Sequence, residues 1–210
     1  MTAASVADGE RGALADLALQ LGPDEPTLCG EWTVRDLLAH LVIRENRPDA
    51  APGILIPPLA WWTARVQSRA ATREFGDLVA TVRGGPPRWS PTALPPLKAV
   101  EVQEFFIHHE DIRRAQPEWS PRPPLPERDA VLWGQVGLLG RLAYRKSPVG
   151  VTLRRPDGAE RVAKSGPRTV TLVGEPGELV LHAAGREQNV VTGEGEPADV
   201  AAVHALDRGL

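Results

Sequence analysis

Three ionisable residues on one predicted helix constrain this chain most, because they point toward its apolar face. Glu104, His108 and Asp111 are spaced four and three residues apart, so they lie on one side of a helix. Ile107 and Ala115 flank them at helical spacing, so this side faces the protein interior. Ionisable groups are rarely buried unless they are paired or hold a metal. The fold must supply partners, and a divalent metal is the leading candidate.

The same residues also allow interpretations without a metal. Glu104 and His108 could form a buried hydrogen-bonded pair, and Asp111 could orient His108 or pair with Arg114. A metal site would need a further ligand, because a catalytic zinc site keeps three protein ligands and an open position. His40 lies at the edge of the apolar stripe of its own predicted helix. Its spacing therefore permits an inward orientation without requiring one.

The remaining candidates are weaker. We expect His109 to point away from the apolar stripe, and His182 and His204 to belong to a second domain. Cys29 has no activating motif around it, so we expect a small loop hydrophobe and not a nucleophile. Trp61, beside a second tryptophan, is expected to contribute to packing.

Bulk properties exclude several classes of protein. The 210 residues carry a net charge of -3, which gives no electrostatic case for nucleic-acid binding. No stretch approaches the roughly 18 apolar residues of a membrane helix, and the N-terminus lacks the features of a secretory signal. One cysteine excludes an internal disulfide and fits a reducing cytoplasm. We therefore expect a cytoplasmic protein that binds neither nucleic acid nor membrane.

The first half of the chain has helical periodicity. Thr33 is expected to cap a helix, with Asp36 in the capping-box position. Pro117 is expected to end the helix that carries His108. The predicted helices cover residues 10–21, 34–42, 59–73 with a short continuation over 77–82, about 97–116, and 127–143.

After Pro148 the pattern alternates with a period of two, which indicates strands. A strand is predicted over 149–155, and the turn at 156–158 is expected to join it to a second strand in a hairpin. Further strands are predicted over 169–173 and 178–183, joined by a turn at 174–177, and a last helix over 198–206. We therefore predict an α+β fold, in which a helical domain over 1–146 precedes a small β-rich domain with a terminal helix over 147–210.

Two segments resemble a known family. The segment 28–41, LCGEWTVRDLLAHL, resembles the first motif of the mycothiol-dependent maleylpyruvate isomerase N-terminal family, within the DinB/YfiT-like four-helix-bundle superfamily. The segment 104–115, EFFIHHEDIRRA, resembles its second motif. The chain is most similar to an uncharacterised actinobacterial subfamily described as metal-binding. The resemblance covers residues 10–146 and extends more weakly to 178–186.

The resemblance implies a DinB-like bundle with three metal ligands, His40, Glu104 and His108. It implies a divalent metal, with zinc favoured over nickel or iron, and a low-molecular-weight thiol cofactor, which is mycothiol in actinobacteria. A metal lowers the pKa of a bound thiol, and the thiolate is a nucleophile. The expected partners are this thiol and a small electrophilic substrate. Asp111 would orient His108 or hold the substrate, and Arg186 could bind a carboxylate.

Four functions remain open from the sequence. The first is a metal-dependent enzyme using a thiol cofactor, an isomerase or a thiol transferase. The second is a metal-dependent hydrolase with Glu110 or Asp111 as general base. The third is a non-catalytic binding or regulatory protein, and the fourth is a structural bundle without metal. Related bundles are often dimeric, so a homodimer is possible, and Val102 and Phe106, on the outer side of their helix, could pack on the tail domain or on a partner chain.

Overall fold

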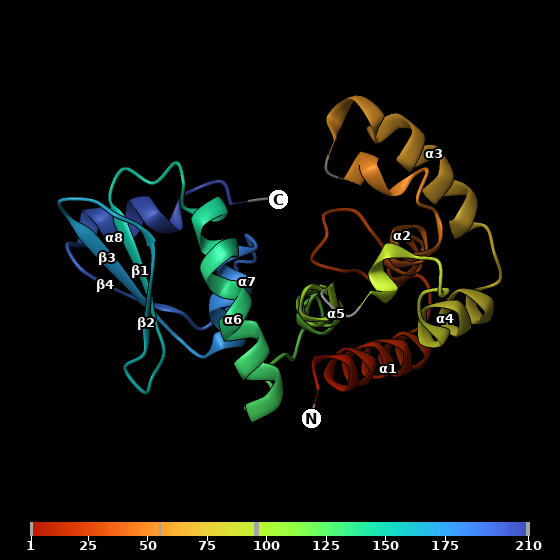
Figure 1. Ribbon diagram of the computed structural model, residues 1–210, viewed down its shortest axis with the longest axis horizontal. Coiled ribbons are helices and arrows are strands. Elements are labelled where there is room, and N and C mark those ends of the chain that lie inside the picture. Colours follow the sequence, from red (N-terminus) through yellow and green to blue (C-terminus); the bar gives the residue numbers. More distant parts are fainter. Residues whose placement is uncertain (1, 55, 95–96, 209–210) are drawn as a thin grey trace. The chain divides into compact units, whose positions relative to one another are not determined.

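The computed structural model describes residues 2–54, 56–94 and 97–208. The chain divides into two compact units, Met1–Trp119 and Ser120–Leu210 (Figure 1). Helix α6 (Pro126–Ala143) packs on α7 (Pro176–Ala183) and on strand β2 (Glu160–Lys164) of the second unit. The division by contacts therefore lies earlier than residue 146, where the change in sequence pattern suggested it.

Unit 1 is helical. Helix α1 packs against α5 and α4, and α2 packs against α3 and α4. The helices are α1 (Ala3–Leu21), α2 (Val34–Asn46), α3 (Ala60–Ala71), α4 (Phe75–Gly84) and α5 (Lys98–Arg114). Short 3-10 helices lie between them: η1 (Ala51–Ile54), η2 (Pro57–Leu59) and η3 (Pro91–Ala93). The core is built from buried aliphatic side chains of α1, α2 and α4 with two residues of α5, Phe105 and Ile112.

The start of α2 is fixed by a capping box, as the sequence predicts. The Thr33 hydroxyl accepts a hydrogen bond from the backbone N–H of Asp36, and the Asp36 carboxylate accepts one from the backbone N–H of Thr33. These bonds satisfy backbone donors that a helix start leaves without partners. An isolated bridge between Pro26 and Thr33 closes the preceding loop. The loop and the helix therefore hold a defined relative position.

Unit 2 combines a four-stranded sheet with helices, three of them in the part that the structure describes. The strand order is β2-β1-β3-β4, with β1 antiparallel to β2, parallel to β3, and β3 antiparallel to β4. Besides β2, α6 and α7, the unit contains β1 (Gly150–Arg154), β3 (Thr169–Val173), β4 (Thr192–Glu194) and α8 (Pro197–His204). The predicted β1–β2 hairpin is confirmed, and Gly158 supplies the positive φ of 88° that its turn requires. The predicted α+β class is confirmed.

One predicted strand is wrong. The segment 178–183 is not a strand but part of helix α7, which begins at Pro176 in the first helical position. Every residue of α7 is buried, so its apolar side chains do not need to keep one face. A short apolar run buried on all sides cannot be assigned to strand or helix by periodicity alone.

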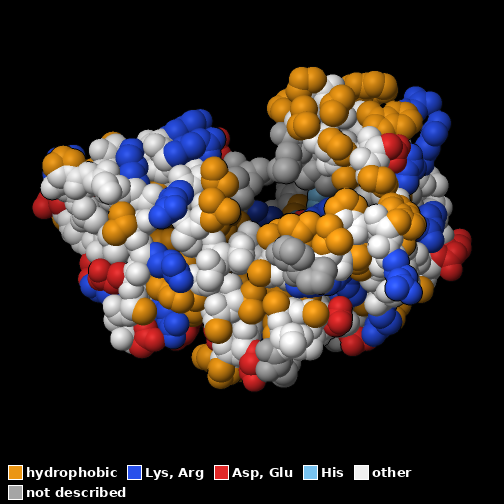
Figure 2. Space-filling model, viewed as in Figure 1, with side chains coloured by type: hydrophobic (Ala, Val, Ile, Leu, Met, Phe, Trp, Pro, Cys, Tyr) orange, Lys and Arg blue, Asp and Glu red, His pale blue; other side chains and the backbone are white. Residues whose placement is uncertain are grey.

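The outer face of unit 1 carries apolar side chains near α3. Figure 2 shows hydrophobic side chains gathered over the part of this unit that holds α3, and Ile56, Leu59 and Trp61 are 47%, 43% and 68% exposed. Trp62 packs on a small core cluster with Ile43, so the expected packing role holds for one of the two tryptophans. Among the described residues, no helix combines the length and the apolar character that crossing a bilayer requires.

Candidate metal centre

Helices α2 and α5 bring together three residues that the sequence singles out, His40, Glu104 and His108. Oε1 of Glu104 lies 3.7 Å from Nε2 of His40 and 3.2 Å from Nε2 of His108, and the two imidazole centroids are 5.3 Å apart. Their ligand atoms all lie within 4.8 Å of one another. Ligands of one tetrahedral ion with bonds of about 2.0–2.2 Å have roughly such separations. The residues present therefore fit a divalent metal.

The centre is largely, but not completely, screened from solvent. The side chains of His40 and His108 are 8% and 11% exposed, whereas that of Glu104 is 24% exposed. Imidazole and carboxylate are ligands that zinc, nickel and iron accept. Three protein ligands would leave a coordination position open, and Glu104 is the most exposed of the three side chains.

Burial and hydrogen bonding set the charge of the three groups in opposite ways. Burial lowers the pKa of His40. Burial opposes ionisation of Glu104, but its interactions with His108, His40 and the Arg44 guanidinium prevail and hold its pKa well below the usual range. Burial also opposes protonation of His108, but Asp111, Cys29 and Glu104 hold its pKa well above the usual range. A metal binding at Nε2 of His108 therefore displaces a proton.

A buried ion-pair network supports Glu104 from the side of the core. Nε of Arg44 lies 3.3 Å from Oε1 of Glu104, and its Nη1 lies 2.5 Å from Oε1 of Glu101. Arg11 of α1 donates to Glu45 at 2.5 and 2.8 Å and to Glu101 at 3.4 Å. Burial raises the pKa of Glu101 to about 7 against the effect of Arg44. The Arg44 guanidinium therefore bridges the carboxylates of Glu101 and Glu104.

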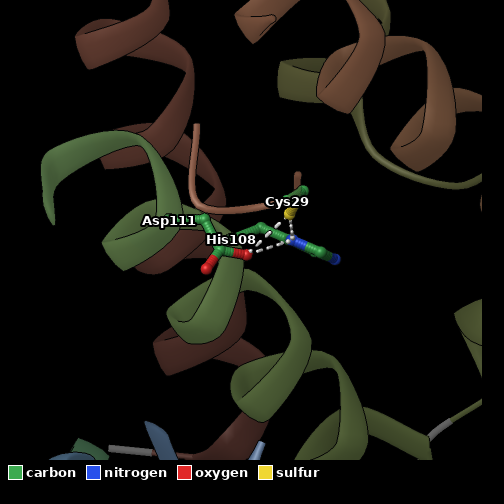
Figure 3. A group of neighbouring side chains, drawn as sticks. All are labelled: Cys29, His108 and Asp111. Carbon is green, nitrogen blue, oxygen red and sulfur yellow. Dashed lines mark hydrogen bonds and ion pairs between the residues drawn. The ribbon is translucent and has the colours of Figure 1, made fainter. Parts of the chain in front are cut away.

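The opposite edge of the His108 ring meets a second cluster. Nδ1 of His108 lies 3.0 Å from Oδ2 of Asp111, the Cys29 thiol donates to the same oxygen at 3.0 Å, and Sγ lies 3.9 Å from Nδ1 (Figure 3). The Leu28 backbone N–H donates to the carbonyl of Asp111 at 3.0 Å, which ties the loop to α5. Asp111 is thus placed to orient His108, one of the three roles that the sequence allows.

Sequence reasoning missed the part played by Cys29. The cysteine precedes Asp111 by 82 residues, so no local spacing connects them. The one feature of the sequence that could have indicated this contact is the short loop before α2, which carries both Cys29 and Trp32. Thr27 accepts from the Cys29 backbone N–H at 3.2 Å and donates to the Trp32 carbonyl at 2.8 Å, while the Trp32 ring lies 5.2 Å from that of His40. One loop therefore contacts both edges of the centre.

The other candidates lie elsewhere. His109 is buried, contrary to the expected outward orientation, with Nδ1 3.5 Å from Oε2 of Glu10 on α1. Val102 and Phe106, also expected to face outward, are 0% and 3% exposed. Arg186 donates to the carbonyl of Ala184 at 2.6 Å.

Glu110, His182 and His204 also have partners outside the set of His40, Glu104 and His108. Glu110 accepts hydrogen bonds from Arg113 and Arg114 at 2.5–3.0 Å, so Arg114 has Glu110 as a carboxylate partner. His182 and His204, in unit 2, bond to each other at 3.0 Å.

Comparison with solved structures identifies the fold. Mycothiol-dependent maleylpyruvate isomerase matches with a TM-score of 0.58 and 16% identity, over 92% of this chain and 91% of that chain. A mutant of mycothiol-dependent maleylpyruvate isomerase matches with a TM-score of 0.60 and 18% identity over the same shares. No protein-family model matches the sequence, and no curated protein does. The chain therefore has the fold of this isomerase, as the resemblance of its two motifs suggested.

Proposed function

We propose that this protein is a divalent-metal-dependent enzyme that uses a small thiol, mycothiol, as cofactor in an isomerase or thiol-transferase reaction. The observation that carries the proposal is the convergence of His40, Glu104 and His108 on one point. The fold shared with a mycothiol-dependent isomerase supports the choice of thiol. When bound, a divalent ion, zinc by preference, lowers the pKa of a thiol beside it, so that the thiol can attack an electrophilic substrate at neutral pH.

The chain's own groups prepare the site for this chemistry. His40, Glu104 and His108 would hold the ion. Asp111 would accept a hydrogen bond from Nδ1–H of His108 and so present Nε2 to the centre. The Arg44 guanidinium, beside Glu104, adds positive charge to the site. One carboxylate among the three ligands leaves a net positive charge with a divalent ion, which favours an anionic fourth ligand such as a thiolate.

The contacts of Glu110 weaken the hydrolase alternative. A metal-dependent hydrolase needs a general base within reach of a water molecule at the centre. Glu110 is 0% exposed and bonded to Arg113 and Arg114, and Asp111 is bonded to His108 and Cys29. Both carboxylates that the sequence offered for this role therefore act as acceptors for neighbouring side chains.

The first test is elemental analysis by mass spectrometry of purified wild type, His108→Ala and His204→Ala. We expect about one equivalent of metal per chain in the wild type and in His204→Ala, which lies in unit 2, and none in His108→Ala. Turnover of maleylpyruvate with and without mycothiol then separates the functions. Metal without thiol-dependent turnover of this or other electrophiles would indicate a binding or regulatory protein. No stoichiometric metal after reconstitution would refute the proposal.

A further inference from the structure

We propose that Cys29, Asp111 and Nδ1 of His108 form a second metal site, selective for thiophilic divalent ions and exclusive of the first. Figure 3 shows the three side chains pointing toward one another, from the loop before α2 and from α5. Each offers one ligand atom, a sulfur, a carboxylate oxygen and an imidazole nitrogen. This proposal does not depend on the proposed function, since it uses different ligand atoms, with His108 contributing Nδ1 in place of Nε2, and requires no catalysis.

The distances fit one ion. Sγ of Cys29 and Nδ1 of His108 each lie 3.0 Å from Oδ2 of Asp111, and they lie 3.9 Å from each other. Ligand atoms with bonds of about 2.0–2.3 Å to one tetrahedral ion are separated by roughly 3.3–3.6 Å. Shifts of a few tenths of an ångström in side chains therefore suffice to complete the site.

Charge distinguishes the two sites. When an ion displaces the thiol proton, the second set carries two negative charges, on Cys29 and Asp111, which neutralise a divalent ion. Asp111 is 0% exposed, and a buried ion requires such compensation. The first set holds one negative charge, on Glu104, and no sulfur. Thiolate ligands favour soft ions, so a thiophilic ion should prefer the second site, and a harder one the first.

The shared histidine makes binding at the two sites exclusive. A neutral imidazole has one nitrogen free to accept and one that carries a proton. An ion on Nδ1 leaves the proton on Nε2, which then faces Oε1 of Glu104 at 3.2 Å. The Nε2 lone pair is no longer available to the first site. Occupation of the second site also replaces the Asp111–His108 hydrogen bond that orients the ring. A thiophilic ion is thereby an inhibitor of the first site.

Cadmium absorption tests the proposal directly, because Cys29 is the chain's single cysteine. Metal-free protein is titrated with Cd²⁺ while thiolate-to-metal absorption in the ultraviolet is recorded. We expect saturation near one equivalent in the wild type and in Glu104→Gln, which lacks a ligand of the first site only. We expect no band in Cys29→Ser. Asp111→Asn should bind Cd²⁺ about tenfold more weakly or worse, as for loss of a ligand. Preloading the wild type with Zn²⁺ should reduce the band.

The variants keep each outcome interpretable. Cys29→Ser retains a hydroxyl that can donate to Asp111, and circular dichroism confirms that each variant is folded. A band of equal affinity in the wild type and Asp111→Asn would show cadmium on the cysteine alone and overturn the proposal, as would the lack of any band. Loss of the band in Glu104→Gln would show that cadmium binds the cysteine only together with Glu104, and this too would overturn a site built from Cys29, Asp111 and His108. None of these results depends on thiol-dependent turnover, so the proposed function fails or succeeds separately.

Discussion

Nδ1 of His108 and Oδ2 of Asp111 lie 3.0 Å apart on neighbouring turns of α5. This contact fixes which ring nitrogen keeps its proton, so that Nε2 faces Glu104 and His40. Carboxylates in this position raise the basicity of a ligating imidazole as well as orienting it. In the proposed centre, the affinity for metal would therefore depend partly on a residue that does not belong to the His40, Glu104 and His108 set.

Replacing Asp111 with asparagine should lower zinc affinity of the centre by about 10- to 100-fold, the usual effect of removing an orienting carboxylate. Competition with a chromophoric chelator measures the affinity. Asp16→Asn is a suitable control, because the Asp16 side chain is 71% exposed on α1. Equal zinc affinity in Asp111→Asn and wild type would contradict the orienting role.

The pair between Arg11 and Glu45 should be among the most sensitive in unit 1. Their side chains are 3% and 0% exposed, so removal of one partner leaves the other charged and buried. We expect Arg11→Met to lower the free energy of unfolding by about 3–5 kcal/mol, measured by urea denaturation.

The matched control is Arg83→Met. Arg83 pairs with Asp16 at 2.6 Å, but these side chains are 43% and 71% exposed. Its loss should cost less than about 1 kcal/mol. Similar losses in the two variants would show that burial does not determine the strength of these pairs.

The spacing of near neighbours in the sequence predicted the helices that carry the candidate site. Contacts between residues far apart in the sequence could not be predicted in this way. The Thr33 capping box and the Glu104, His108 and Asp111 stripe depend on neighbours three and four residues apart, which a sequence displays directly. The position of Cys29 depends on a contact across 82 residues. Helix α7 is buried on all sides, so the spacing of its apolar residues does not distinguish a helix from a strand.

The surroundings of α5 were underestimated for the same reason. The stripe predicted one buried face, but His109 and Glu110 between its members are also buried. Glu10 of α1 receives His109, and this partner lies on a helix whose packing against α5 cannot be read from either segment alone. Periodicity identifies the most apolar side of a helix, and it does not exclude burial of the others.

Stability of unit 2 should fall with acidification through His182. Burial lowers the pKa of His182 to about 3 from its usual 6.5, with smaller effects of Arg208 and His204. The unfolded chain therefore binds a proton between pH 6.5 and about 3 that the folded state excludes. This contribution is complete above pH 6.5 and is lost as pH falls, by roughly one kcal/mol per pH unit.

Urea denaturation of wild type and His182→Gln at pH 7.5 and pH 5 measures this effect. The glutamine keeps polar atoms near the Tyr144 hydroxyl, which lies 2.7 Å from Nδ1 of His182, but it does not titrate. The difference in unfolding free energy between the two pH values should be smaller in the variant. An unchanged difference would assign the acid sensitivity to other groups.

Loss of the α2 cap should be modest and specific. Thr33→Ala removes the hydroxyl that accepts from the Asp36 N–H, with an expected cost of about 1 kcal/mol in unfolding free energy. Thr33→Ser restores the acceptor and should restore most of the stability. Thermal or urea denaturation of the three proteins provides the test, and equal stability of the alanine and serine variants would exclude capping as the cause.

The Arg11 network has a consequence for how unit 1 assembles. Arg11 meets Glu45 and Glu101 across 34 and 90 residues of sequence, so these charges are neutralised only after long loops have closed. Contacts of such separation slow folding, and a bundle without α1 would leave two carboxylates buried without this arginine. An N-terminal truncation should therefore not yield a smaller working bundle. Helix α1 therefore supplies positive charge that compensates the buried carboxylates of α2 and α5.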